Sequence, residues 1–82
     1  MYYSILKGRK TFNTSNRVDL LNQIRIILLN SKSKECADAS YHNIIHWLRW
    51  DDLSFEYVLE FYDHEENIVK IVIQKNYFNA WS

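Results

Sequence analysis

Residues 54–75 read SFEYVLEFY-DHEEN-IVKIVIQK, two runs of alternating apolar and polar residues joined by five polar ones. Alternation with a period of two is typical of strands that bury one face, so the stretch predicts a β-hairpin with strands at 55–62 and 68–75 and a loop at 63–67. Folding it about the loop pairs Phe61 with Val69, Leu59 with Ile71 and Tyr57 with Ile73 inside, and Glu60 with Lys70 and Val58 with Val72 outside. A shift of one residue would mix the two faces, so the register is well specified.

The region before this hairpin predicts a first helix. Its apolar residues recur at helical spacing and share one face: Leu20, Leu21, Ile24, Ile27 and Leu28. They indicate a helix at 17–30. Asn16 is the expected N-cap, because Asp19 follows three residues later as in a capping box.

A second helix is expected after a polar loop at 31–35. Its apolar stripe stands at i, i+3, i+4 and i+7: Tyr41, Ile44, Ile45 and Leu48. The stripe indicates a helix at 39–50 capped by Asp38 or Ser40. By helical phase, Trp47 and Trp50 point away from this stripe.

The N-terminal residues predict a second, shorter hairpin. Strands at 2–6 and 10–12 would meet at Gly8, the sole glycine, which adopts positive φ at little cost.

The tail at 76–82 carries three aromatic residues and is expected to dock on the domain. The chain is therefore predicted as one compact domain, 1–82, of the α+β class: a two-layer sandwich in the order ββ-α-α-ββ, with an antiparallel sheet of two hairpins covered by two helices. The order of the strands in the sheet stays open.

Length and composition exclude several classes of protein. The chain has 82 residues, of which 48% are hydrophobic, enough for one core and too many for an intrinsically disordered chain. Cys36 is the single cysteine, which excludes an internal disulfide. No apolar run approaches a membrane span, and the N-terminus lacks the pattern of a signal peptide. Asn, Lys, Ile, Tyr and Phe are frequent, a usage that AT-rich codons favour, so a low-GC microbe or its virus is the expected source. The lone cysteine is compatible with a reducing compartment, and we expect a protein of the cytoplasm of a host cell.

The charges are sorted by position along the chain. Residues 1–34 hold seven cations and one acid, whereas residues 35–82 hold three cations and nine acids. Such asymmetry indicates a charged partner. Oppositely charged poles could also pair head to tail with a second copy of the chain, so a homodimer stays open.

The acidic half favours a protein partner with a basic surface. Glu56 and Glu60 lie on the outward face of the predicted strand, whose inner face carries Phe55, Tyr57, Leu59 and Phe61, and tryptophan and arginine are frequent anchors in interfaces. The expected partner-binding residues are Trp47, Arg49, Trp50, Asp52, Glu56, Glu60, Glu65 and Glu66. The competing interpretation is that these charges only discourage aggregation of an exposed hairpin.

The basic half supports an alternative, RNA or single-stranded DNA. Cations interleaved with aromatic residues suit phosphate contacts and base stacking. The residues concerned are Lys7, Arg9, Lys10, Lys32 and Lys34. An ordinary solvated turn and loop would have the same composition.

No motif predicts catalysis or a metal. His42 and His46 stand at i, i+4 downstream of Cys36, but a tetrahedral site needs more ligands, so two solvated histidines are the simpler interpretation. A P-loop, a nucleophile elbow and paired catalytic carboxylates are absent from the sequence. We expect no cofactor, no metal and no enzymatic activity.

The sequence thus favours a small non-catalytic binding protein. It would be an inhibitor of the virus-encoded anti-defence, immunity or antitoxin type. The acidic hairpin and the aromatic anchors would engage a basic surface of a larger nucleic-acid-handling protein. No membrane partner is expected.

Overall fold

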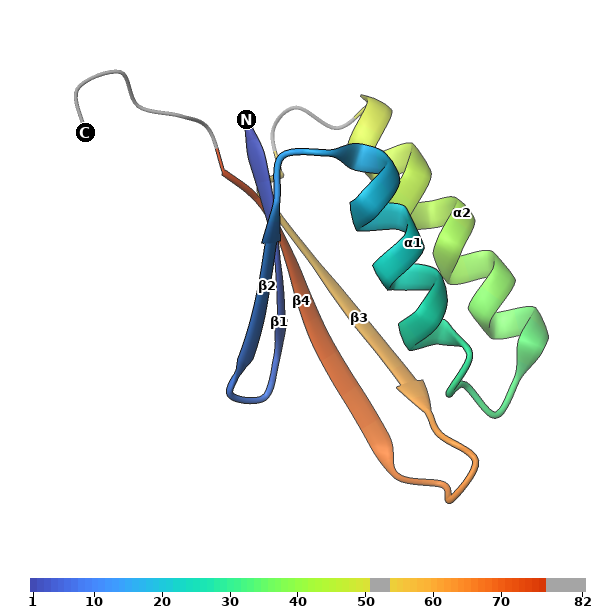
Figure 1. Cartoon of the computed structure of the whole chain (residues 1–82). Helices are drawn as coiled ribbons and strands as arrows, with labels where there is room; N and C mark the ends of the chain where they lie inside the picture. Colours follow the sequence, from blue (N-terminus) through green and yellow to red (C-terminus); the bar gives the residue numbers. More distant parts are fainter. Residues whose placement is uncertain (51–53, 77–82) are drawn as a thin grey trace.

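Four strands form one antiparallel sheet, and two helices lie against one of its faces (Figure 1). The computed structural model describes residues 1–50 and 54–76. The elements are β1 (Tyr2–Lys7), β2 (Lys10–Thr14), α1 (Arg17–Leu28), α2 (Lys34–Trp50), β3 (Glu56–Tyr62) and β4 (Ile68–Asn76). The predicted α+β class is confirmed. The expected docking of the tail falls on residues 77–82, which lie outside the described residues.

The C-terminal hairpin has the predicted register. All five predicted pairs occur, with Glu60 opposite Lys70 and Val58 opposite Val72 on the outer face. The prediction that Phe55 lies in the core is wrong, because this residue precedes β3 at the end of the sheet and its side chain is 52% exposed. Its carbonyl oxygen still accepts the N–H of Lys75 (2.9 Å), so the backbone pairing continues past the strand.

The two hairpins meet through β1 and β4, which gives the strand order β2-β1-β4-β3. Ile5 lies opposite Ile73 in this seam, and Leu6 lies opposite Val72. Ser4 at the centre of β1 donates its Oγ hydrogen to Oδ1 of Asn13 on β2 (2.6 Å) and accepts a hydrogen bond from Nδ2 of Asn76 on β4 (2.9 Å). Side chains thus reinforce the pairing of β1 with both of its neighbours, β2 and β4.

The N-terminal hairpin is longer than expected. β2 runs to Thr14, two residues beyond the predicted end at Phe12, because Asn13 and Thr14 pair with Ser4 and Tyr3. Gly8 occupies the turn with φ of 60°, the conformation for which glycine was predicted there.

Helix α1 begins where its cap predicts. Oδ1 of Asn16 accepts the backbone N–H groups of Val18 (2.8 Å) and Asp19 (3.4 Å). The helix ends at Leu28, two residues before the predicted end, and Leu29 is its C-cap. The face predicted to be apolar packs into the core, whereas Val18 and Ile26 are exposed.

Replacing Asn16 by alanine should lower the free energy of unfolding by about 1 kcal/mol, the usual cost of losing an N-cap acceptor. Asn22→Ala is the matched control, because Asn22 is exposed in the middle of the same helix, where alanine is the better helix former. Urea denaturation of both variants measures the difference. Equal losses at the two positions would show that the cap does not stabilise α1.

Helix α2 begins at Lys34, five residues before the predicted start, so the predicted loop at 31–35 and the caps Asp38 and Ser40 are wrong. Oγ of Ser33 accepts the N–H of Cys36 (3.2 Å), and the carbonyl oxygen of Ser33 accepts the N–H of Ala37 (3.0 Å). Ser33 therefore caps the helix. The first turns of α2 lack a continuous apolar stripe, which is why hydrophobic periodicity placed the start too late.

The C-terminus of α2 is held by two cations. Its last carbonyl groups have no partner within the helix, and a positive charge there also complements the helix dipole. Nη2 of Arg17 donates to the carbonyl oxygen of Leu48 (3.1 Å), and Nζ of Lys75 donates to that of Trp47 (2.7 Å). Nε of Arg17 also donates to the hydroxyl of Tyr3 (2.9 Å), so this end of α2 is tied to α1, β1 and β4.

Trp47 lies in the core, so the prediction that it points away from the apolar stripe is wrong. Its side chain is 4% exposed, and Nε1 donates to the carbonyl oxygen of Ser54 (3.1 Å). The centroid of its ring lies 5.7 Å from the centroid of the Tyr57 ring and 4.4 Å from Nζ of Lys75. Trp47 is on the flank of α2 that faces β3, and its large ring reaches the sheet from there.

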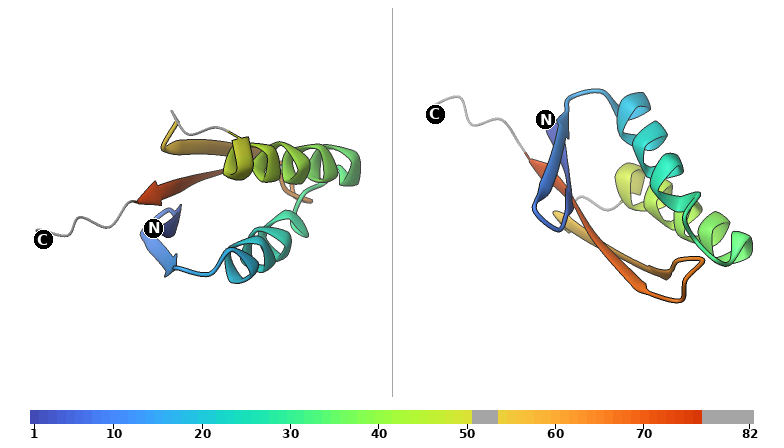
Figure 2. Two further views of the ribbon diagram at one scale, coloured as in Figure 1. Left: turned by 90° about the horizontal axis from the view of Figure 1, so that it is seen from above. Right: turned by 60° about the horizontal axis from the view of Figure 1, so that its bottom comes forward.

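The core fills the space between the sheet and the helices, and both views in Figure 2 place α1 and α2 on the same side of the sheet. The fully buried side chains come from both layers: Leu20, Ile24, Ile44, Leu59, Ile71 and Ile73. The described helices α1 and α2 are too short or too polar to cross a membrane. Within residues 1–50 and 54–76, no helix covers the opposite face of the sheet, which is called the uncovered face below.

Candidate protein-binding face

The uncovered face of the sheet carries an apolar row across three strands. Leu6 on β1 lies opposite Val72 on β4, which in turn lies opposite Val58 on β3. Leu6 and Val72 are half-buried, and Val58 at the outer strand is 50% exposed. A partly exposed apolar row on a sheet face is the kind of surface that proteins use for association.

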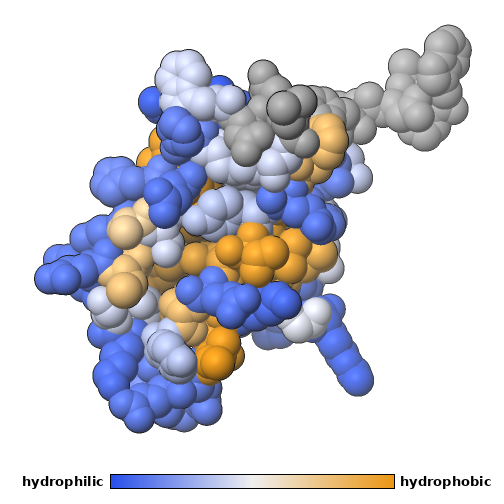
Figure 3. Space-filling view, turned by 180° about the vertical axis from the view of Figure 1, so that it is seen from behind, coloured by the Kyte–Doolittle hydropathy of each residue, from blue (hydrophilic) through white to orange (hydrophobic). Residues whose placement is uncertain are grey.

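Polar side chains border this row on both sides. On one side Nε2 of Gln74 donates to Oε1 of Glu56 (3.0 Å), which holds this carboxylate at the margin of the row. On the other side Lys70 and Glu60 lie opposite each other, and beyond them Ile68 and Tyr62 are exposed. Viewed from behind, hydrophobic side chains gather into a patch that hydrophilic ones surround (Figure 3). An apolar centre with a polar rim is the usual anatomy of a protein interface.

The C-terminal end of β3 is paired along its outer edge with the connection between α1 and α2. The backbone N–H of Lys32 donates to the carbonyl oxygen of Tyr62 (2.8 Å), and Ser31 forms a bridge with Asp63. Towards its start, β3 carries Glu56 and Glu60, and charged side chains at an edge discourage pairing with another strand. The face of β3 is therefore better suited to docking than its edge.

The predicted partner-binding residues do not form one surface. Glu56 and Glu60 project from the uncovered face, as predicted, and Glu65 is exposed on the β3–β4 loop. Arg49 and the 71% exposed Trp50 belong to α2, on the other side of the sheet, and Trp47 is buried. Glu66 forms a salt bridge with Lys32. Asp52 lies outside the described residues.

Two basic residues of the first half of the chain lie beside acids of the second half. The β1–β2 turn, the α1–α2 connection and the β3–β4 loop lie at the same end of the molecule, the lower end in Figure 1. Lys7 lines a cavity of about 270 Å³ together with Asp63, His64 and Glu65. Together with the Lys32–Glu66 salt bridge, this places Lys7 and Lys32 of the first half beside acids of the second.

The histidines and the cysteine do not converge. His42, His46 and Cys36 are exposed on α2, and Nε2 of His64 lies within hydrogen-bonding distance of the carbonyl oxygen of Leu29 (3.3 Å). In residues 1–50 and 54–76, no three His, Cys, Asp or Glu side chains are grouped to hold a metal ion.

Comparisons with protein-family models, with curated proteins and with solved structures found no match. The function is therefore inferred from the surface of the chain itself. The apolar residues of this face were not predicted to bind a partner: Leu6, Val58, Tyr62, Ile68 and Val72. The sequence does contain an indication of this apolar surface, because Val58 and Val72 form an outward-facing pair among the charged residues of the C-terminal hairpin.

Proposed function

We propose that this chain is a small non-catalytic binding protein, of the inhibitor or adaptor type, which docks the uncovered face of its sheet on a larger protein. The observation that carries the proposal is the apolar row of Leu6, Val72 and Val58, which lies uncovered between the carboxylates of Glu56 and Glu60. The row supplies apolar area to bury, and the carboxylates give the partner its orientation.

The carboxylates favour a partner with a basic surface. Glu56 is held in place by Gln74, and an ordered carboxylate suits bidentate contact with an arginine of the partner. Glu60 faces Lys70 across the strands without forming a salt bridge within 4.0 Å, so it is available to a cation of the partner. Proteins that handle nucleic acids carry such basic surfaces, which agrees with an inhibitor of the anti-defence, immunity or antitoxin type.

A photo-crosslinking experiment in the native lysate tests the docking face. A benzophenone amino acid at position 58, on the uncovered face, should crosslink to a partner protein. The same amino acid at Val18 is the control, because Val18 is exposed on α1, in the other layer. Mass spectrometry identifies the products. Crosslinks from position 18 alone, or from neither position, would contradict docking through the sheet.

Charge reversal on the captured complex tests the basic partner. Glu56→Lys together with Glu60→Lys should slow association by about tenfold or more at low salt and should flatten its dependence on salt. Glu35→Lys is the control, because it reverses the charge of a single exposed residue on α2, outside this face. It should have a smaller effect on the association rate. Equal association rates for the wild type and the double variant would rule out electrostatic recognition.

The alternative of RNA or single-stranded DNA has weaker support. Lys7 and Lys10 are partners in the first hairpin, with Arg9 in the turn between them. However, Lys32 is paired with Glu66, and Asp63 and Glu65 lie around the same cavity as Lys7. Carboxylates at this end of the molecule would repel phosphate groups.

A further inference from the structure

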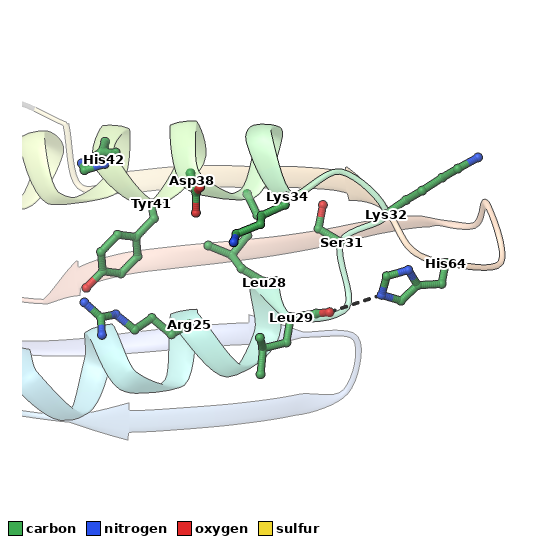
Figure 4. A pocket seen from close by; sticks show the side chains of 11 residues that line it. Arg25, Leu28, Leu29, Ser31, Lys32, Lys34, Asp38, Tyr41, His42 and His64 are labelled. Carbon is green, nitrogen blue, oxygen red and sulfur yellow. Dashed lines mark hydrogen bonds between the residues drawn. The ribbon is translucent and has the colours of Figure 1, made fainter.

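A cleft of about 680 Å³ separates α1 from α2 near the connection between them. Apolar side chains line part of it, namely those of Leu28, Leu29 and Ala37. The ring of Tyr41 reaches from α2 across the cleft toward Arg25 on α1 (Figure 4). A volume of this size lies within the range of about 300–1,000 Å³ that is usual for small-molecule sites.

The charged groups around the cleft are mostly positive. It is lined by Arg25, Lys32 and Lys34, against the single carboxylate of Asp38. Lys32 points away from the cleft in Figure 4 and pairs with Glu66. Arg25 and Lys34 have no carboxylate within 4.0 Å among the residues that the structure describes. Their charges are therefore available to a ligand.

Arg25 is already positioned at the cleft. Its Cζ atom lies 4.8 Å from the centroid of the Tyr41 ring, a cation–π contact that joins α1 to α2. This contact orders the guanidinium group before a ligand binds, which lowers the entropy lost on binding. The guanidinium still keeps N–H donors for a carboxylate.

We propose that this cleft binds an organic anion with an apolar body, of the class of acyl or aryl carboxylates. The carboxylate would accept hydrogen bonds from Arg25, and the positive charge of Lys34 elsewhere on the cleft would add to the attraction. The apolar body would lie over Leu28 and Ala37. The cleft lies on the helical side of the molecule, away from the uncovered sheet face. The proposal is therefore independent of the proposed partner.

Decanoate, below its micellar concentration, is the probe for this site. In ¹H–¹⁵N spectra of the full chain, it should shift the amide signals of residues 25–42 in a saturable way. Decyltrimethylammonium, which has the same tail and the opposite charge, should cause no such shifts. Decanol should bind more weakly than decanoate. Equal binding of all three probes, or decanoate shifts confined to the sheet, would overturn the proposal.

Two substitutions test the assigned cations. Arg25→Gln and Lys34→Gln should together weaken decanoate binding by about tenfold or more, and Lys34→Gln alone by less. Arg9→Gln is the control, because Arg9 is an exposed cation in the β1–β2 turn. All three positions in these variants are at the surface, so the fold should persist, as circular dichroism can verify. Unchanged affinity in the double variant would contradict the assignment.

Discussion

Replacement of Trp47 by alanine is expected to lower the free energy of unfolding by about 3–5 kcal/mol. The substitution removes a ring that is 4% exposed, together with the Nε1 hydrogen bond to Ser54 and the contacts with Tyr57 and Lys75. A domain of this length has a total stability of roughly 4–12 kcal/mol, so much of it would be lost. Urea denaturation followed by circular dichroism measures the effect without relying on tryptophan fluorescence.

Trp50 supplies the matched control. It lies three residues further along the same helix, and its side chain is 71% exposed, so Trp50→Ala should change stability by about 0.5 kcal/mol or less. Trp47→Phe keeps most of the apolar volume and should be less destabilising than the alanine variant. A Trp47→Ala variant as stable as the wild type would contradict the core position and restore Trp47 as a surface anchor.

Replacement of Lys75 by methionine is expected to lower the free energy of unfolding by about 1.5–3 kcal/mol, the range for a hydrogen bond to a charged group. Methionine keeps an apolar side chain in this 5% exposed position. It cannot donate to the carbonyl oxygen of Trp47, and it removes the cation above the Trp47 ring. The C-terminal turn of α2 would lose part of its cap.

Lys70→Met on the same strand is the control, because it makes the same substitution at an exposed lysine that caps no helix. Lys70 is exposed on the other face of the sheet, so its replacement should leave stability nearly unchanged. Amide hydrogen exchange should show faster exchange in the last turn of α2 for the Lys75 variant only. Equal destabilisation by the two substitutions would exclude a capping role for Lys75.

Local signals predicted most of the fold. Alternation was sufficient for the register of the β3–β4 hairpin, since a one-residue slip would expose Leu59 and Ile71. Asn16 and Gly8 marked a helix start and a turn because each residue type has a local backbone preference. The start of α2 was missed because Ser33 caps a turn whose residues carry no continuous apolar stripe.

The candidate site was harder to predict, because it depends on which strands become neighbours. Val58 and Val72 were recognised as a pair, but Leu6 joins their row only through the pairing of β1 with β4. The separation of charge along the chain is reduced in space at one end of the molecule, where Lys32 of the α1–α2 connection pairs with Glu66 of the β3–β4 loop. Trp47 was misplaced because helical phase takes no account of how far a large ring reaches.

The β1–β4 seam also has a consequence for synthesis. Asn76 and Ser4, which are hydrogen-bonded across it, stand 72 residues apart in the sequence. Contacts between such distant residues raise the contact order and slow folding. A nascent chain would emerge from the ribosome with its first hairpin complete but unable to join a sheet until the last strand is translated. We therefore expect the sheet to form only after β4 has left the ribosome.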